Sequence, residues 1–141
     1  MNYLRLVDIA KSMTDFSNKK RCHHFSFILK KNRVISIGVN TKKTHPKNLI
    51  NRKVSLKTGV DFSEEKHTCS EFNSILKLKN LTNIDTKKCV LVNIRIDKNN
   101  NTGHSKPCMS CENLLKFFEF KKILWTNKNG ELVSNEKIKS F

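Results

Sequence analysis

The chain has 141 residues, of which 37% are hydrophobic and 28% charged. This composition fits one globular domain and excludes a wholly disordered chain or two cores of ordinary size. Lysine and arginine (28) outnumber aspartate and glutamate (12), and the formal net charge of +16 favours partners that carry phosphate. No stretch approaches the roughly 20 apolar residues of a membrane span, and residues 1–5 lack the apolar core of a signal peptide. We therefore expect a cytoplasmic protein with no membrane partner.

The first half of the chain predicts a helix, a hairpin and a long loop. Apolar residues recur every third position over residues 2–16, which is typical of an amphipathic helix. Aromatic and β-branched segments at 24–29 and 34–39 predict a β-hairpin, although the residues between them include no glycine. Residues 41–67 are basic and lack sustained periodicity, so we expect a basic loop beside the functional site.

The second half alternates helices and strands. Residues 70–78 predict a short helix, and the apolar run at 89–97 predicts a central strand buried on both faces. A second helix follows Pro107, which suits a first helical turn because it needs no N–H there. Strands at 123–125 and 132–134 flank a short turn, so we expect an α/β fold with the order α-β-β-α-β-α-β-β.

The cysteines indicate metal chemistry rather than disulfides. Their number is odd and no secretion signal precedes them, so reduced thiols are expected, with Cys22 and Cys89 packed as small core residues. Cys69 lies two residues before Glu71, and Cys108 and Cys111 form a Cys-x-x-Cys pair after Pro107. Both segments open predicted helices, where the partial positive charge of the helix favours ionised ligands. Three thiolates leave one tetrahedral position of a metal ion open, which is typical of a catalytic site.

Three segments resemble the zinc-dependent cytidine/deoxycytidylate deaminase superfamily. CSEFNSI at 69–75 is similar to its His/Cys-Ala-Glu-x-Asn-Ala-Ile helix, IGVN at 37–40 to its Gly-x-Asn strand end, and SKPCMSC at 105–111 to its second zinc motif. The resemblance covers about residues 20–134, and more loosely the sequence details also resemble phage or bacterial CMP/dCMP deaminases. It implies a single deaminase domain over residues 1–141 with the cytidine deaminase-like three-layer fold: a five-stranded mixed sheet with helices on both faces.

The resemblance also implies a site and a reaction. Cys69, Cys108 and Cys111 would bind Zn²⁺, with His67 as an alternative first ligand or a residue that lines the pocket. A zinc-bound hydroxide would attack the amino-bearing ring carbon while Glu71 shuttles the protons. Asn40 would hold the sugar or base, and the backbone around Ser70 would read the edge of the base. The enzyme would be a hydrolase acting on C–N amidine bonds.

Two departures from the family pattern bear on the substrate. Phe72 stands where related three-thiolate sites resemble Cys-Ala-Glu-Arg, so Lys66, His67 or Lys106 would have to offset the negative charge. Lys42 replaces the acidic residue that follows the strand asparagine of ribonucleoside deaminases, which favours a phosphate-bearing substrate. His45 is a further candidate contact in the same loop, although a turn with Pro46 is the simpler account of it.

Three functions follow from these observations. The first is deamination of cytosine in a nucleoside or nucleotide similar to cytidine or dCMP. The second is deamination of cytosine or adenine in single-stranded DNA or RNA, in which the basic loop would follow the backbone. The third is an inactive zinc-containing module that binds nucleic acid. Dimers or larger homo-oligomers are common in this fold.

Overall fold

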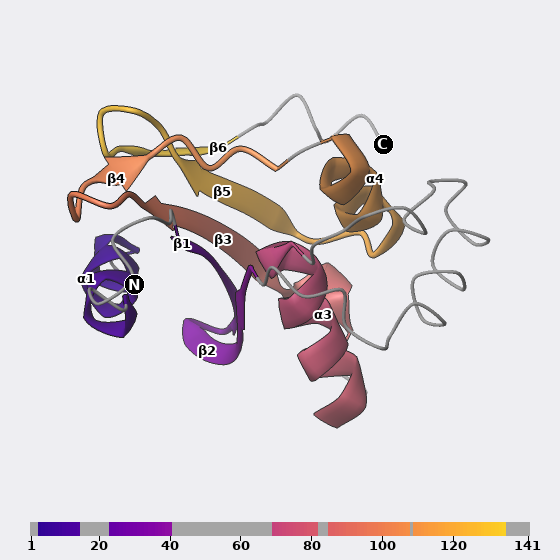
Figure 1. The fold of residues 1–141 in the computed structure, drawn as a ribbon. Coiled ribbons are helices and arrows are strands. Elements are labelled where there is room, and N and C mark those ends of the chain that lie inside the picture. Colours follow the sequence, from indigo (N-terminus) through magenta and orange to yellow (C-terminus); the bar gives the residue numbers. More distant parts are fainter. Residues whose placement is uncertain (1–2, 15–22, 41–68, 82–84, 108, 135–141) are drawn as a thin grey trace.

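The computed structural model describes residues 3–14, 23–40, 69–81, 85–107 and 109–134 (Figure 1). The predicted basic loop at 41–67 lies outside these residues. A mixed sheet forms the centre of the described part. Its strands are β1 (His23–Lys30), β2 (Arg33–Val39), β3 (Val90–Ile96), β4 (Thr102–Gly103), β5 (Lys122–Thr126) and β6 (Leu132–Ser134).

The strand order is β2-β1-β3-β5-β6, with β4 added to β3. β1 is antiparallel to both β2 and β3, β3 and β5 are parallel, and β5 and β6 are antiparallel. The predicted hairpin and the predicted central strand are therefore confirmed. β3 is apolar along most of its length because it lies inside the sheet and is covered on both faces.

The predicted count of five strands was wrong for the described residues, where the sheet has six strands. The additional strand is β4, in which Gly103 pairs with Arg95 and Thr102 pairs with Ile96. A strand of two residues is too short for an alternating pattern to reveal it. It turns the loop after β3 back along the sheet before the second cysteine motif.

The hairpin turn explains how β1 and β2 connect without glycine. Lys31 and Asn32 both adopt left-handed backbone conformations, with φ of 50° and 63°. A two-residue turn of this kind matches the twist of the strands that it joins, and asparagine tolerates it well.

Helices cover both faces of the sheet, as predicted. The core consists of two hydrophobic clusters, one on each face of the sheet. The buried face of α1 (Leu4–Met13) belongs to one cluster, and α3 (Ser70–Leu81) and α4 (Met109–Phe117) contribute to the other. Successive residues of β1 divide between the two clusters, because strand side chains alternate in direction: Phe27 faces α1, and Ile28 faces α3 and α4. In Figure 1 α1 lies to the left and α3 and α4 to the right. None of the described helices is long and apolar enough to cross a membrane.

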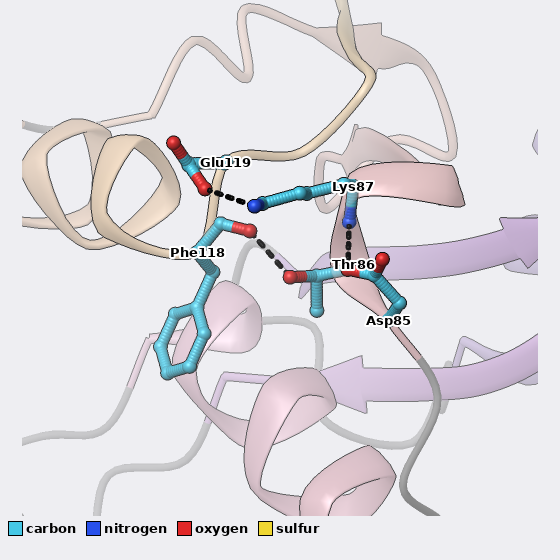
Figure 2. A network of polar contacts seen from close by, with 5 residues as sticks. All are labelled: Asp85, Thr86, Lys87, Phe118 and Glu119. Carbon is cyan, nitrogen blue, oxygen red and sulfur yellow. Dashed lines mark hydrogen bonds and ion pairs between the residues drawn. The ribbon is translucent and has the colours of Figure 1, made fainter.

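A short 3-10 helix, η1 (Thr86–Lys88), ties the end of α4 to the start of β3 (Figure 2). The Thr86 hydroxyl donates to the carbonyl oxygen of Phe118, and Lys87 forms a 3.2 Å ion pair with Glu119. The Asp85 carboxylate caps η1 by accepting from the Lys87 N–H at 3.0 Å. The ion pair is exposed and contributes little, so the buried threonine is the part of this network that fixes α4.

Candidate active site

The first turn of α3 presents Cys69 and Glu71. Cys69 immediately precedes the helix, and its carbonyl oxygen accepts the N–H of Asn73 at 3.1 Å. Glu71 is 6% exposed, and no ion pair joins it to a cation of the described residues, which is unusual for a buried carboxylate. The partial positive charge at a helix N-terminus favours an anionic side chain in this position.

β2 sets the position of α3 through a very close approach at Gly38. A Cβ atom on Gly38 would lie 2.2 Å from the Ser70 carbonyl oxygen and 2.4 Å from the Ser74 nitrogen, so only glycine fits there. Ser36 donates to the Ser74 carbonyl oxygen at 2.7 Å, and Asn73 donates to that of Val39 at 2.7 Å. The glycine of the Gly-x-Asn segment therefore lets α3 rest directly on the sheet.

The second motif leads into α4. Ser105 and Pro107 are buried before the helix, and Cys111 is buried in its first turns. The Ser105 hydroxyl lies 2.9 Å from that of Thr126 and donates to the Asn93 carbonyl oxygen at 2.8 Å, so the segment is anchored to β5 and β3. Lys106 is exposed and holds its ammonium group 5.9 Å from the centre of the Trp125 ring. This arrangement keeps a positive charge beside the second motif.

A buried polar network joins the two motifs across the sheet. The Ser26 hydroxyl lies 2.6 Å from Asn93 Oδ1, 2.8 Å from Ser70 Oγ and 3.4 Å from Glu71 Oε1. Ser70 donates to the same Oε1 at 2.8 Å. On the other side, Asn93 Nδ2 donates to the Ser105 carbonyl oxygen at 3.4 Å. The starts of both motif helices thus meet above neighbouring strands.

The two carboxylate oxygens of Glu71 have different surroundings. Oε1 receives the contacts from Ser26 and Ser70, whereas Oε2 has no hydrogen bond within the described residues and is not among their buried polar atoms that lack a partner. Oε1 is therefore the carboxylate oxygen that the described residues hold in place.

Asn40 and Ser70, two of the predicted substrate contacts, make structural hydrogen bonds. Asn40 Oδ1 accepts the backbone N–H of His24 at 3.0 Å, and the Asn40 N–H donates to the His24 carbonyl oxygen at 3.2 Å. The Ser70 side chain joins the buried network, so only its backbone is left for a ligand. The other predicted site residues that lie outside the described residues are Lys42, His45, His67 and Cys108.

Two of the three predicted zinc ligands, Cys69 and Cys111, are among the described residues, and both suit a zinc ion. Cys69 and Cys111 are thiols without disulfides at the starts of α3 and α4, and these two helices contact each other. Thiolates at helix starts are suitable zinc ligands. Groups of three or more candidate ligands are absent from the described residues, which do not include Cys108.

Sequence interpretation missed Ser26 and Asn93. Both interrupt apolar strands, as Phe25-Ser26-Phe27 and Val92-Asn93-Ile94, and both are fully buried or nearly so, at 0% and 3% exposure. A polar side chain in a buried strand needs a partner, and this was the signal that could have identified them.

His24 and Arg95 lie opposite each other on β1 and β3, one step along the same sheet face from Ser26 and Asn93. Burial above all, and then the charges of Arg95 and His23, lower the pKa of His24 below its ordinary value of 6.5. A histidine and an arginine therefore border the network, with the histidine favoured in its neutral form.

Stability should depend on pH through His24. Between its lowered pKa and 6.5, the unfolded chain binds more protons at this histidine than the folded protein does. The free energy of unfolding should therefore fall as the pH is lowered through that interval, and recover above it. Urea denaturation at pH 5.5 and 7.5 should show a smaller difference for His24→Gln than for the wild type. The same change at the exposed His104 is the control, and an equal pH dependence in His24→Gln would contradict the assignment.

Comparison with known proteins supports the fold. No family model and no curated protein sequence matches the chain. Among solved structures, it is similar to a dCMP deaminase from the cyanophage S-TIM5 in its apo form, with a TM-score of 0.52. The two sequences are 12% identical, and the similarity covers 89% of this chain and 80% of the other. At this identity the similarity shows a shared fold and leaves the activity to be argued from the site.

Proposed function

We propose that the protein is a zinc-dependent hydrolytic deaminase of cytosine in a nucleoside or nucleotide similar to cytidine or dCMP. One observation carries the proposal: a buried Glu71 carboxylate, held through Oε1 by the Ser70 hydroxyl, lies two residues after Cys69 at the start of α3. The fold shared with a phage dCMP deaminase supports the same assignment.

Cys69, Cys108 and Cys111 would hold zinc, with His67 as the alternative first ligand. Bound there, the ion would supply a Lewis acid that lowers the pKa of a water far below its bulk value, toward about 7. Lys106 lies next to Pro107 and would offset part of the negative charge of three thiolates. Phe72, at the position where related sites have arginine, is buried in the core and cannot do so.

Glu71 would move the protons. Its Oε2 would take a proton from the attacking water and deliver it to the ring nitrogen next to the amino-bearing carbon. The same oxygen would then take the second proton of that water from the hydroxyl now on the ring carbon, and pass it to the departing amino group, which leaves as ammonia as the ring carbonyl forms. Throughout, the hydrogen bond from Ser70 to Oε1, with the Ser26 hydroxyl 3.4 Å from the same oxygen, would keep the carboxylate in one orientation.

Asn40 and the loop after it would bind the rest of the substrate. Because Asn40 Oδ1 is engaged by His24, its amide N–H groups are the part left to contact a sugar hydroxyl. We assign Lys42 and His45 to a phosphate group, and the backbone of Ser70 to the edge of the base. The antiparallel pairing of β5 and β6, which resembles that of free-cytidine deaminases, favours a small substrate over a polynucleotide.

The decisive experiment measures ammonia release by the zinc-loaded protein. The substrates are cytidine, deoxycytidine, their monophosphates and single-stranded oligonucleotides. Release from the monomers supports the proposal. Release from oligonucleotides alone, with affinity that falls steeply as salt rises, would identify a polynucleotide deaminase instead. No release from any substrate would leave the zinc-containing binding module as the function.

Zinc content should depend on the two described thiols. Cys69→Ser and Cys111→Ser should each lower the zinc in the purified protein well below a stoichiometric amount, because a site with two sulfur ligands binds the metal much more weakly. Elemental analysis provides the measurement. Cys89→Ala is the matched control, since Cys89 is a buried core thiol and its loss should leave the zinc in place. Full zinc retention by Cys111→Ser would contradict the ligand set.

A further inference from the structure

Ser26 and Asn93 form a buried polar pair in the middle of the sheet. They are direct register partners on β1 and β3, and their side chains lie 2.6 Å apart. A strand pair at this depth normally carries apolar side chains, because a buried polar group without a partner destabilises the fold. The pair is tolerated because its hydrogen bonds are made within the network.

The network ends on a single atom of the candidate catalytic group. Ser26 and Ser70 both contact Glu71 Oε1, and Ser26 is itself held by Asn93. A carboxylate fixed by one oxygen cannot rotate freely about its last side-chain bond. Its other oxygen then points in a defined direction, as a proton shuttle requires.

Asn93 also ties this carboxylate to the second motif. The side-chain amide of Asn93 donates to the Ser105 carbonyl oxygen at 3.4 Å, and the main-chain carbonyl oxygen of Asn93 accepts from the Ser105 hydroxyl at 2.8 Å. Ser105 lies three residues before Cys108. One side chain therefore links the start of α3 to the segment that leads into α4.

We propose that Ser26 and Asn93 are positioning residues that hold the Glu71 carboxylate in a fixed position relative to the second cysteine motif. The proposal rests on the function proposed above, since it gives the proton shuttle its orientation. It goes further because both residues lie outside every segment that resembles the deaminase motifs.

Ser36 separates this role from simple support of the helix. Like Ser26, it is a buried serine on a strand beneath α3, and it donates to the Ser74 carbonyl oxygen at 2.7 Å. It holds the helix but makes no contact with Glu71. Ser36→Ala and Ser26→Ala thus each remove a serine hydroxyl, from two neighbouring strands. Only Ser26→Ala removes a hydroxyl that contacts the Glu71 carboxylate.

Steady-state kinetics of the zinc-loaded protein gives the first test. Ser26→Ala should lower kcat about 10- to 100-fold, with KM within about threefold of the wild type, because a displaced catalytic group slows the reaction more than it weakens binding. Ser26→Thr keeps the hydroxyl and should recover most of the loss. Ser36→Ala should retain kcat and lose only stability. Equal kcat values for Ser26→Ala and Ser36→Ala would overturn the proposal.

A second measurement does not need turnover. In protein labelled with carbon-13 at the glutamate carboxyls, the Glu71 signal is the one that Glu71→Gln removes. Ser26→Ala and Asn93→Ala should each move this signal, whereas Ser36→Ala should leave it in place. If the wild type releases no ammonia, the proposed function fails. The carbon-13 signal of Glu71 then tests by itself whether Ser26 and Asn93 position the carboxylate. An unmoved signal in Ser26→Ala overturns the inference in either case.

Discussion

Gly38→Ala should lower the free energy of unfolding by about 3 kcal/mol and displace the start of α3. The added methyl group would lie 2.2 Å from the Ser70 carbonyl oxygen and 2.4 Å from the Ser74 nitrogen. Both are main-chain atoms of one helix, so no side-chain rotation can relieve the clash. The helix must move away from β2, and Cys69 and Glu71 move with it. Urea denaturation measures the stability, and zinc content and ammonia release measure the damage to the site.

Gly103→Ala is the control for that experiment. Its added methyl would meet only the flexible side chain of Arg95, with the nearest atom, Cδ, at 3.1 Å. This change should stay within about 1 kcal/mol of the wild type. If Gly38→Ala were no more destabilising than Gly103→Ala, the close contact between α3 and β2 would be wrong.

Glu71→Gln should lower kcat about 10²- to 10⁴-fold, the usual contribution of a positioned general acid and base. Glutamine has nearly the same shape and can still accept the hydrogen bond from Ser70, so the helix start and the network should persist. It cannot carry a proton between water and the ring. Because glutamate is not a metal ligand in the proposed site, zinc content should remain at the wild-type level.

Three readouts make the Glu71 result specific. Ammonia release gives the activity, elemental analysis gives the zinc, and calorimetric titration with the preferred nucleotide gives the binding. Glu119→Gln, an exposed carboxylate at the far end of α4 from Cys111, is the matched control and should behave as the wild type. Turnover within about threefold of the wild type in Glu71→Gln would remove Glu71 from the mechanism. If the wild type itself shows no turnover but binds nucleic acid, and Glu71→Gln retains that binding, a binding module is favoured.

Much of the fold could be predicted because its signals are local. The aromatic and β-branched residues of β1 and β2 indicate strands, and the continuous apolar run of β3 indicates that both of its faces are covered. The hairpin was predicted even though Lys31 and Asn32 give a weaker turn signal than glycine. β4 was not predicted because a strand of two residues is too short to show an alternating pattern. Its pairing also depends on the path of the loop after β3.

The candidate site divides in the same way. Cys69, Glu71 and Cys111 were selected because their Cys-x-Glu and Cys-x-x-Cys spacings are similar to the deaminase motifs. Ser26 and Asn93 could not, because their role exists only after β1, β3 and α3 have packed together. Asn40 shows a third case: its position was predicted, but the hydrogen bond that fixes its oxygen to His24 depends on the register of two strands.

The exposed Lys31–Asn32 turn offers a place to attach a reporter. It lies at the opposite end of β1 from His24 and Asn40, and five strand residues, roughly 17 Å, separate Lys31 from Ser26. A fluorophore or a surface tether fixed there would sit well away from the carboxylate and the thiols. Single molecules could then be immobilised through this turn for measurements of ligand binding.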